Sequence, residues 1–264
     1  MTAYGITRWK NVLFQLLFFN LARKKPEKTK ERLLDLVREQ LGPDYDIATH
    51  FTPKYNPWDQ RLCLVPDADL FDSIKSGQSS VVTDQIETFT EDGLLLKSGK
   101  TLKADVVVTA TGLQLQLLGG MEVVVDGKVA DLSKAFSYKG MMFSDVPNLA
   151  SAFGYTNASW TLKADLTSEY VCRLLKRLDR VRADYCVPRV DDRNMPVAPW
   201  LDFSSGYVTR SIGMFPKQGP KAPWKAHQNY ALDLMTLRFG KVDDGVMEFG
   251  RKTGAGAATL KAAA

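Results

Sequence analysis

One segment in the middle of the chain constrains the fold more than any other. Residues 101–112 read TLKADVVVTATG, so three consecutive valines, Val106 to Val108, precede the small residues Ala110, Thr111 and Gly112. A continuous β-branched run is typical of a strand that is buried on both faces. Small residues after such a strand let backbone approach a ligand, as in open α/β sheets. The segment predicts an α/β fold, and on pattern alone a ligand turn and a strand that only packs remain alternatives.

The residues before this strand predict a β-meander. Residues 81–89 and 94–96 are suited to strands, and they flank a turn at Glu91-Asp92-Gly93. A second turn at Ser98-Gly99-Lys100 returns the chain towards the valine run. We therefore expect the meander to lead directly into the buried strand.

Apolar spacing elsewhere predicts several helices and one further hairpin. Long helices are expected at 6–23, 29–41 and 159–182, a short one at 67–76 and a final one near 225–237. Asp126-Gly127 predicts a hairpin between 122–125 and 128–130. Residues 148–153 are expected to form a strand, whereas 43–68 and 188–223 are rich in Pro or Gly and read as loops.

Composition excludes several classes of function. The net charge of +5 is modest, and the basic cluster at 23–32 is interleaved with Glu27 and Glu31, so nucleic acid is not an expected partner. Two histidines and three cysteines without short spacing indicate no metal site and disfavour a Ser/His/Asp hydrolase. The cysteines, odd in number and without a secretory signal, are expected to be small buried residues in a reducing cytoplasm.

An apolar run near the N-terminus raises the question of a membrane segment. Residues 12–22 are eleven residues interrupted by Gln15 and Asn20, which is short of the roughly 20 residues that span a bilayer. We expect no transmembrane segment here, but a helix whose aromatic face, if uncovered, would favour aggregation or peripheral membrane association.

Several segments occur in an order that resembles a known family. They are Tyr55-Asn-Pro-Trp-Asp-Gln-Arg-Leu-Cys63, Ala104-Asp-Val-Val-Val-Thr-Ala-Thr-Gly112, Phe143-Ser-Asp-Val-Pro-Asn-Leu-Ala-Ser-Ala-Phe-Gly-Tyr155, and a tail with Ser205-Gly-Tyr207, Pro216-Lys-Gln-Gly219 and Pro223-Trp224. Together they resemble the C-terminal portion of class B flavoprotein monooxygenases, and the Baeyer–Villiger branch fits best.

The resemblance implies a fold and a division of the chain. The fold would be a partial FAD/NAD(P)-binding Rossmann-like flavoprotein fold, with two dinucleotide-binding domains and a β-meander. Residues 1–104 would be a remnant of the NADPH-binding domain, 105–250 the C-terminal part of the FAD-binding domain, and 251–264 a disordered tail. Neither Gly-x-Gly-x-x-Gly/Ala fingerprint of the family occurs in this sequence. We therefore expect a fragment, a split gene product or a degenerate copy of such an enzyme, for which an N-terminal half would be the complementing partner.

The resemblance also implies a reaction. FAD, NADPH and O2 would insert one oxygen atom next to a ketone carbonyl or oxidise a sulfur compound. Arg61 aligns with the family's active-site arginine, and a permanent cation suits the negative charge that develops in this chemistry. Gln60 stands where other members often carry Lys, which puts NADP contacts of that position in doubt. Considered without the resemblance, Arg61 would more readily form an ion pair with Asp59 or Asp67.

Cofactor contacts are expected at two further places. Ala110, Thr111 and Gly112 would bring backbone against the cofactor. Asn157 precedes a predicted helix, whose free N–H groups favour partial negative charge such as a flavin oxygen, and Trp160 would line the pocket. The alternatives are an ordinary helix cap and a buried aromatic side chain. Two functions therefore remain open, a flavin monooxygenase and a non-catalytic remnant that cannot hold FAD by itself.

Overall fold

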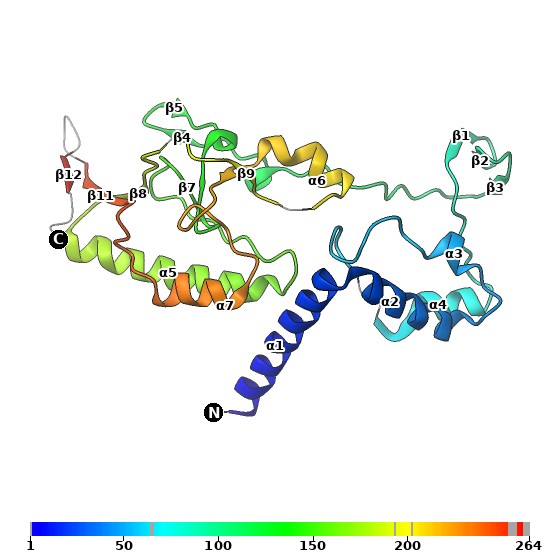
Figure 1. Ribbon diagram of the computed structural model, residues 1–264. Coiled ribbons are helices and arrows are strands. Elements are labelled where there is room, and N and C mark those ends of the chain that lie inside the picture. The colour runs from blue at the N-terminus through cyan, green and yellow to red at the C-terminus, as the bar shows by residue number, and fades with distance from the viewer. Residues whose placement is uncertain (1, 64–65, 193, 202, 253–257, 261–264) are drawn as a thin grey trace. The chain divides into compact units, whose positions relative to one another are not determined.

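The computed structural model describes residues 2–63, 66–192, 194–201, 203–252 and 258–260 (Figure 1). The chain divides into two compact units. Unit 1 comprises Met1–Leu17 and Gln114–Ala264, and unit 2 comprises Phe18–Leu113. Each unit is described by itself below.

Unit 2 combines short helices with a three-stranded sheet. Helix α1, Ala3–Lys24, begins in unit 1 and ends in unit 2, and it is followed by α2 (Pro26–Leu41), α3 (Ile47–His50), the 3-10 helix η1 (Pro66–Ala68) and α4 (Asp69–Lys75). Pro26 occupies the first turn of α2, where a missing N–H costs no hydrogen bond. Gly42 then ends α2 at a φ of 86°.

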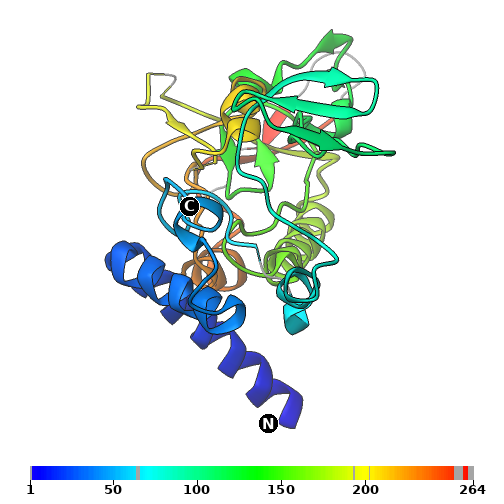
Figure 2. The ribbon, with the colours of Figure 1, turned by 90° about the vertical axis from the view of Figure 1, so that its right-hand side faces the viewer.

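The predicted meander is confirmed. Strands β1 (Ile86–Thr90), β2 (Gly93–Leu96) and β3 (Thr101–Lys103) form an antiparallel sheet in the order β1-β2-β3 (Figure 2). Gly93 has a φ of 147°, and a Cβ there would overlap the carbonyl oxygen of Leu102. The tight Asp92-Gly93 turn therefore requires glycine at this position.

The prediction of a buried strand after the meander is wrong for this structure. Val106, Val107 and Val108 are exposed by 78%, 39% and 84% and belong to no strand. The valine pattern encodes strand propensity, but a strand also needs neighbours for its backbone and a covering for its faces. The described residues supply neither to this segment.

Unit 1 is built around one long helix and several small antiparallel sheets. Helix α5, Trp160–Val181, packs Leu166, Tyr170 and Leu174 into the main core. The other elements are η2 (Leu117–Gly120), β4 (Val124–Val125), β5 (Lys128–Val129), η3 (Leu132–Lys134), β6 (Ser137–Tyr138), β7 (Met142–Phe143), β8 (Tyr185–Pro188), β9 (Ala198–Pro199), α6 (Gly206–Ser211), η4 (Ile212–Met214), β10 (Lys217–Gln218), α7 (Tyr230–Asp233), the π-helix η5 (Leu234–Phe239), β11 (Met247–Arg251) and β12 (Ala258–Leu260). The sheets pair as β4-β5, β6-β7, β10-β9 and β12-β11-β8.

Most predicted helices are confirmed with small shifts of their ends. The hairpin at Asp126-Gly127 is confirmed as β4 and β5. The expected strand at 148–153 is wrong, because these residues contribute a single bridge, between Ala150 and Met142. Helices and small antiparallel sheets thus form a mixed α/β structure. The predicted tail, 251–264, lies largely outside the described residues.

Three expectations from composition can be compared with the described residues. No cluster of His, Cys, Asp or Glu suited to a metal occurs among them. Within the same residues, no helix is long and apolar enough to cross a membrane. Cys186 is buried as expected, and burial raises the pKa of its thiol to about 11. The prediction is wrong for Cys63 and Cys172, which are exposed.

Candidate functional site

The segment that carries Arg61 is fixed by its neighbours on the N-terminal side. The Trp58 ring packs edge-on against Phe19 of α1, with the ring centres 5.4 Å apart. Arg23 donates from Nη1 to Oδ1 of Asp59 at 3.2 Å, and the other oxygen of Asp59 accepts from the backbone N–H of Asn56. Trp58 adopts a φ of 69°, an uncommon conformation for a bulky residue, at the start of the turn that leads to Arg61.

Arg61 itself is exposed, and its guanidinium has no hydrogen bond or ion pair with the residues that the structure describes. Asp59 pairs instead with Arg23, so an Arg61–Asp59 ion pair does not explain this arginine. Asp67 has no ion pair with a described residue either. The guanidinium is therefore available to an external anion or a developing negative charge.

Ala110, Thr111 and Gly112 belong to an extended, exposed segment of unit 2. Gly112 has a φ of 129°, a conformation that side chains disfavour. Among the described residues, the backbone groups of 105–112 make no hydrogen bond with protein. These groups can therefore donate to a ligand or to another polypeptide.

Asn157 lies in a loop of unit 1 that is held by a second segment far along the chain. Its Nδ2 donates to the carbonyl oxygen of Gln228 at 2.9 Å. The side-chain oxygen of Gln228 accepts from both the N–H and the hydroxyl of Thr156, at 2.9 and 3.0 Å. Tyr155 donates from its hydroxyl to Asp233 at 2.7 Å. Residues 228–233 therefore fix the conformation of the 155–157 loop.

Trp160 begins α5 and is 50% exposed, so it is not the fully buried aromatic of the alternative reading. It contacts Phe153 at 5.1 Å between ring centres, and a Cβ on Gly154 would overlap its ring. Ser159 occupies the N-cap position but makes no side-chain cap hydrogen bond. The first turn of this 22-residue helix thus leaves N–H groups open to a partly negative ligand atom.

A buried ion pair lies behind this loop. Lys163 of α5 donates from Nζ to Oδ2 of Asp233 at 2.8 Å, and both side chains are at most 4% exposed. Burial lowers the pKa of Lys163, while the charge of Asp233 opposes that shift. Burial, and then the nearby Asp233 carboxylate, raises the pKa of Tyr155, so this hydroxyl stays protonated and donates. The pair and the tyrosine share one carboxylate oxygen.

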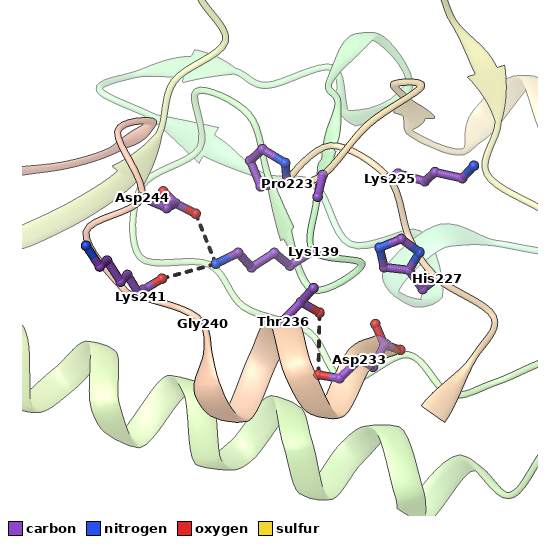
Figure 3. Close-up of a pocket in the computed structure, with 10 residues that line it drawn as sticks. Lys139, Pro223, Lys225, His227, Asp233, Thr236, Gly240, Lys241 and Asp244 are labelled. Carbon is purple, nitrogen blue, oxygen red and sulfur yellow. Dashed lines mark hydrogen bonds and ion pairs between the residues drawn. The ribbon is translucent and has the colours of Figure 1, made fainter. Parts of the chain in front are cut away.

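Asp233 also faces a cavity of about 300 Å³ (Figure 3). Lys139 lies in its wall, where its ammonium group contacts Asp244 at 3.0 Å and the Tyr170 hydroxyl at 3.1 Å. Burial lowers the pKa of Lys139, and burial also lowers the pKa of His227, which lines the same cavity. Lys139 in the wall of this cavity and Lys163 behind the 155–157 loop are each paired with a carboxylate of the protein.

The structure brings Asn157 and Trp160 together around one loop of unit 1. Arg61 and the Ala110–Gly112 turn belong to unit 2. Sequence reasoning missed Lys163, Gln228 and Asp233, which support the loop. A signal for Lys163 was present, because it shares the buried helix face of Leu166 and Tyr170. Its partner is 70 residues away in the chain, and no local pattern indicates that distance.

Comparison with known proteins places the chain among homologues of one functional class. The FAD-containing monooxygenase EthA of Mycobacterium tuberculosis is 48% identical over 250 residues, which cover 95% of this chain and 51% of the relative. A probable FAD-binding monooxygenase, AlmA of Acinetobacter baylyi, is 48% identical over 252 residues, or 95% of the chain and 50% of the relative. The putative FAD-containing monooxygenase MymA of M. tuberculosis is 44% identical over 247 residues, or 93% and 50%.

No family model matches the chain. The three relatives nevertheless agree in their described class, and each aligns over nearly all of this chain. The chain is therefore similar over nearly its whole length to proteins named as FAD-containing or FAD-binding monooxygenases. It spans about half the length of these relatives.

Proposed function

We propose that this chain, a homologue of FAD-containing monooxygenases, forms the rear part of a Baeyer–Villiger-type enzyme that uses FAD, NADPH and O2. The substrate class is a ketone, or a compound with an oxidisable sulfur atom. The observation that carries the proposal is a free arginine, Arg61, in a chain that is 48% identical to such a monooxygenase over 95% of its length. In this proposal 1–104 derives from an NADPH-binding domain and 105–250 from a partial Rossmann-like FAD-binding domain, in a cytoplasmic protein.

The described residues suit the flavin ring of FAD better than its pyrophosphate. Unpaired backbone N–H groups at Ala110–Gly112 and at the start of α5 can donate to oxygen atoms of a flavin ring. Trp160 offers a half-exposed aromatic surface at the start of α5. A glycine fingerprint for the pyrophosphate does not occur in the sequence. FAD would therefore need a phosphate cradle that these residues do not supply.

The chemical role that we assign to Arg61 is electrostatic. FAD, when bound and reduced, supplies the reaction with O2. Arg61 keeps its proton at any working pH, and its guanidinium can bind the negative charge that develops on oxygen during transfer. Residues 155–157 position the start of α5, and Gln228 and Asp233 hold that loop from behind. Neither Gln228 nor Asp233 needs to touch the substrate for this role.

A second candidate function is a non-catalytic remnant. It is favoured by the 78% and 84% exposure of Val106 and Val108, because the residues before the Ala110–Gly112 turn form no covered strand in this chain. Such a chain would not hold FAD without help. Supplying the missing nucleotide-binding half as a second polypeptide distinguishes the two candidates.

The test is NADPH-dependent oxygen uptake with a simple ketone, after the chain is mixed with the part of the M. tuberculosis relative EthA that lies outside the match. We expect ester formation with the unmodified chain and a loss of at least about a hundredfold with Arg61→Ala, because one electrostatic contact of this kind is typically worth that much. Arg32→Ala is the matched control, since Arg32 is an exposed arginine on α2 of the same unit. Full ester formation by Arg61→Ala would exclude the proposed role.

A further inference from the structure

The cavity of about 300 Å³ in unit 1, which we call the Asp233 cavity, contains a buried carboxylate oxygen that lacks a donor (Figure 3). The Asp233 side chain is 3% exposed, and its Oδ2 accepts from Lys163 Nζ at 2.8 Å and from the Tyr155 hydroxyl at 2.7 Å. Its Oδ1 accepts no hydrogen bond from a described residue. Because a buried carboxylate oxygen without a donor is costly, a molecule in the cavity has to supply that donor.

His227 is a second polar group of the Asp233 cavity without a partner. Neither of its ring nitrogens forms a hydrogen bond within the described part of the chain. Burial lowers the pKa of His227, so the ring is neutral at pH 7 and carries one N–H donor and one acceptor nitrogen. Figure 3 shows the Asp233 carboxylate turned toward this ring. One hydroxyl group between them can donate to Asp233 and accept from His227 at the same time.

Lysine side chains give the Asp233 cavity a surplus of positive charge. Both carboxylates of its wall, Asp233 and Asp244, are already paired with a lysine. Two further lysines, Lys225 and Lys241, line the cavity on opposite sides, and neither forms an ion pair with a described residue (Figure 3). Both are exposed, and exposed side chains change rotamer within nanoseconds, so their ammonium groups can turn to an anion at the mouth. This surplus disfavours an amine as the donor to Asp233.

We propose that the Asp233 cavity binds a small hydroxylated dicarboxylate. The hydroxyl of the ligand bridges Asp233 and His227, and its two carboxylates reach Lys225 and Lys241 at the mouth. A volume of about 300 Å³ is at the lower end of cavities that hold small molecules, which suits a ligand of this size. None of these contacts involves FAD or NADPH, so the site is separate from the oxygen chemistry proposed above.

The experiment titrates the full chain with malate and with succinate in a calorimeter, because these dicarboxylates differ by one hydroxyl group. We expect malate to bind at least about tenfold more tightly, since succinate leaves the buried oxygen of Asp233 unpaired. The chain has two histidines, His50 and His227. In a nuclear magnetic resonance titration, malate should shift the imidazole signals of His227, whereas those of His50, in unit 2, should stay in place.

The variants remove one contact at a time. Lys225→Met with Lys241→Met should weaken malate binding at least about tenfold and leave the thermal unfolding of the ligand-free chain unchanged, because both side chains are exposed. Lys176→Met with Lys221→Met is the matched control, since it removes the same charge from exposed lysines that do not line the cavity. His227→Phe assigns the imidazole signals and should abolish the preference for malate over succinate.

Equal affinity for malate and succinate would overturn the inference. So would the absence of heat at about 10 mM malate, a His227 signal that does not move while malate binds, or an equal loss of binding in the two double variants. No FAD or NADPH is present in these titrations. A chain that binds malate as expected and fails to support oxygen uptake would therefore contradict the proposed function and leave this site intact.

Discussion

At the scale of single residues, an exposed arginine, Arg61, contrasts with a buried ion pair between Lys163 and Asp233. Arg61 could be selected from its segment, and the structure leaves its guanidinium free of the Asp59 ion pair that was the main alternative. The Lys163–Asp233 pair could not be predicted, because it depends on a contact between α5 and a residue 70 positions later. A lysine on an apolar helix face indicates that a buried acidic partner exists, but the helix sequence does not show which residue it is.

The buried pair leads to a test of stability. Asp233→Asn leaves the ammonium group of Lys163 buried without its counter-charge, and it also weakens the acceptor of the Tyr155 hydroxyl. We expect the free energy of unfolding to fall by about 3 kcal/mol, as for other broken buried pairs. Chemical denaturation measures this loss. The control is Lys176→Met, an exposed change on α5, the helix that carries Lys163. It should alter the free energy of unfolding by less than about 0.5 kcal/mol. An equal loss of stability in both variants would contradict a stabilising role for the Lys163–Asp233 pair.

At the scale of elements, periodicity succeeded where an element packs within its own unit. Helix α5 matches its apolar spacing nearly residue for residue, because Leu166, Tyr170 and Leu174 all reach the core of unit 1. The Asp126-Gly127 hairpin also formed, since its turn is local. Residues 105–112, with their three consecutive valines, have equally clear spacing and formed no strand, because a strand requires partners that the local sequence does not contain.

Helix α1 also has apolar side chains that the described residues leave uncovered. Phe14 and Leu17 are 69% and 59% exposed, so part of the apolar surface of this helix is uncovered in the structure, and its expected effect on association stays a prediction. We expect Phe14→Ser with Leu17→Ser to lower the fluorescence of a bound hydrophobic dye at least twofold, with no loss of thermal stability. Leu175→Ser, at a 54% exposed position on α5, should lower the fluorescence less. Unchanged dye binding in the double variant would show that this face is not the apolar surface of the chain.

At the scale of the whole molecule, the sequence indicated the class of enzyme better than the architecture. The ordered segments resemble a flavin monooxygenase, and the relatives carry that description at 44–48% identity. The expected Rossmann-like sheet did not follow from the same segments, since the described strands pair only in small antiparallel sheets. A resemblance between sequences can be recognised from short matching segments. A parallel sheet forms only where neighbouring strands pair with one another, and short segments do not show which strands those are.

The central claim is that this chain contributes to a flavin site that it cannot complete by itself. Its most direct test is the visible spectrum after incubation with FAD and removal of free FAD by gel filtration, with and without the unmatched part of the relative EthA. We predict flavin absorbance near one FAD per chain in the mixture and almost none in the isolated chain. Stoichiometric flavin in the isolated chain, or none in a mixture that has formed a complex, would contradict the account.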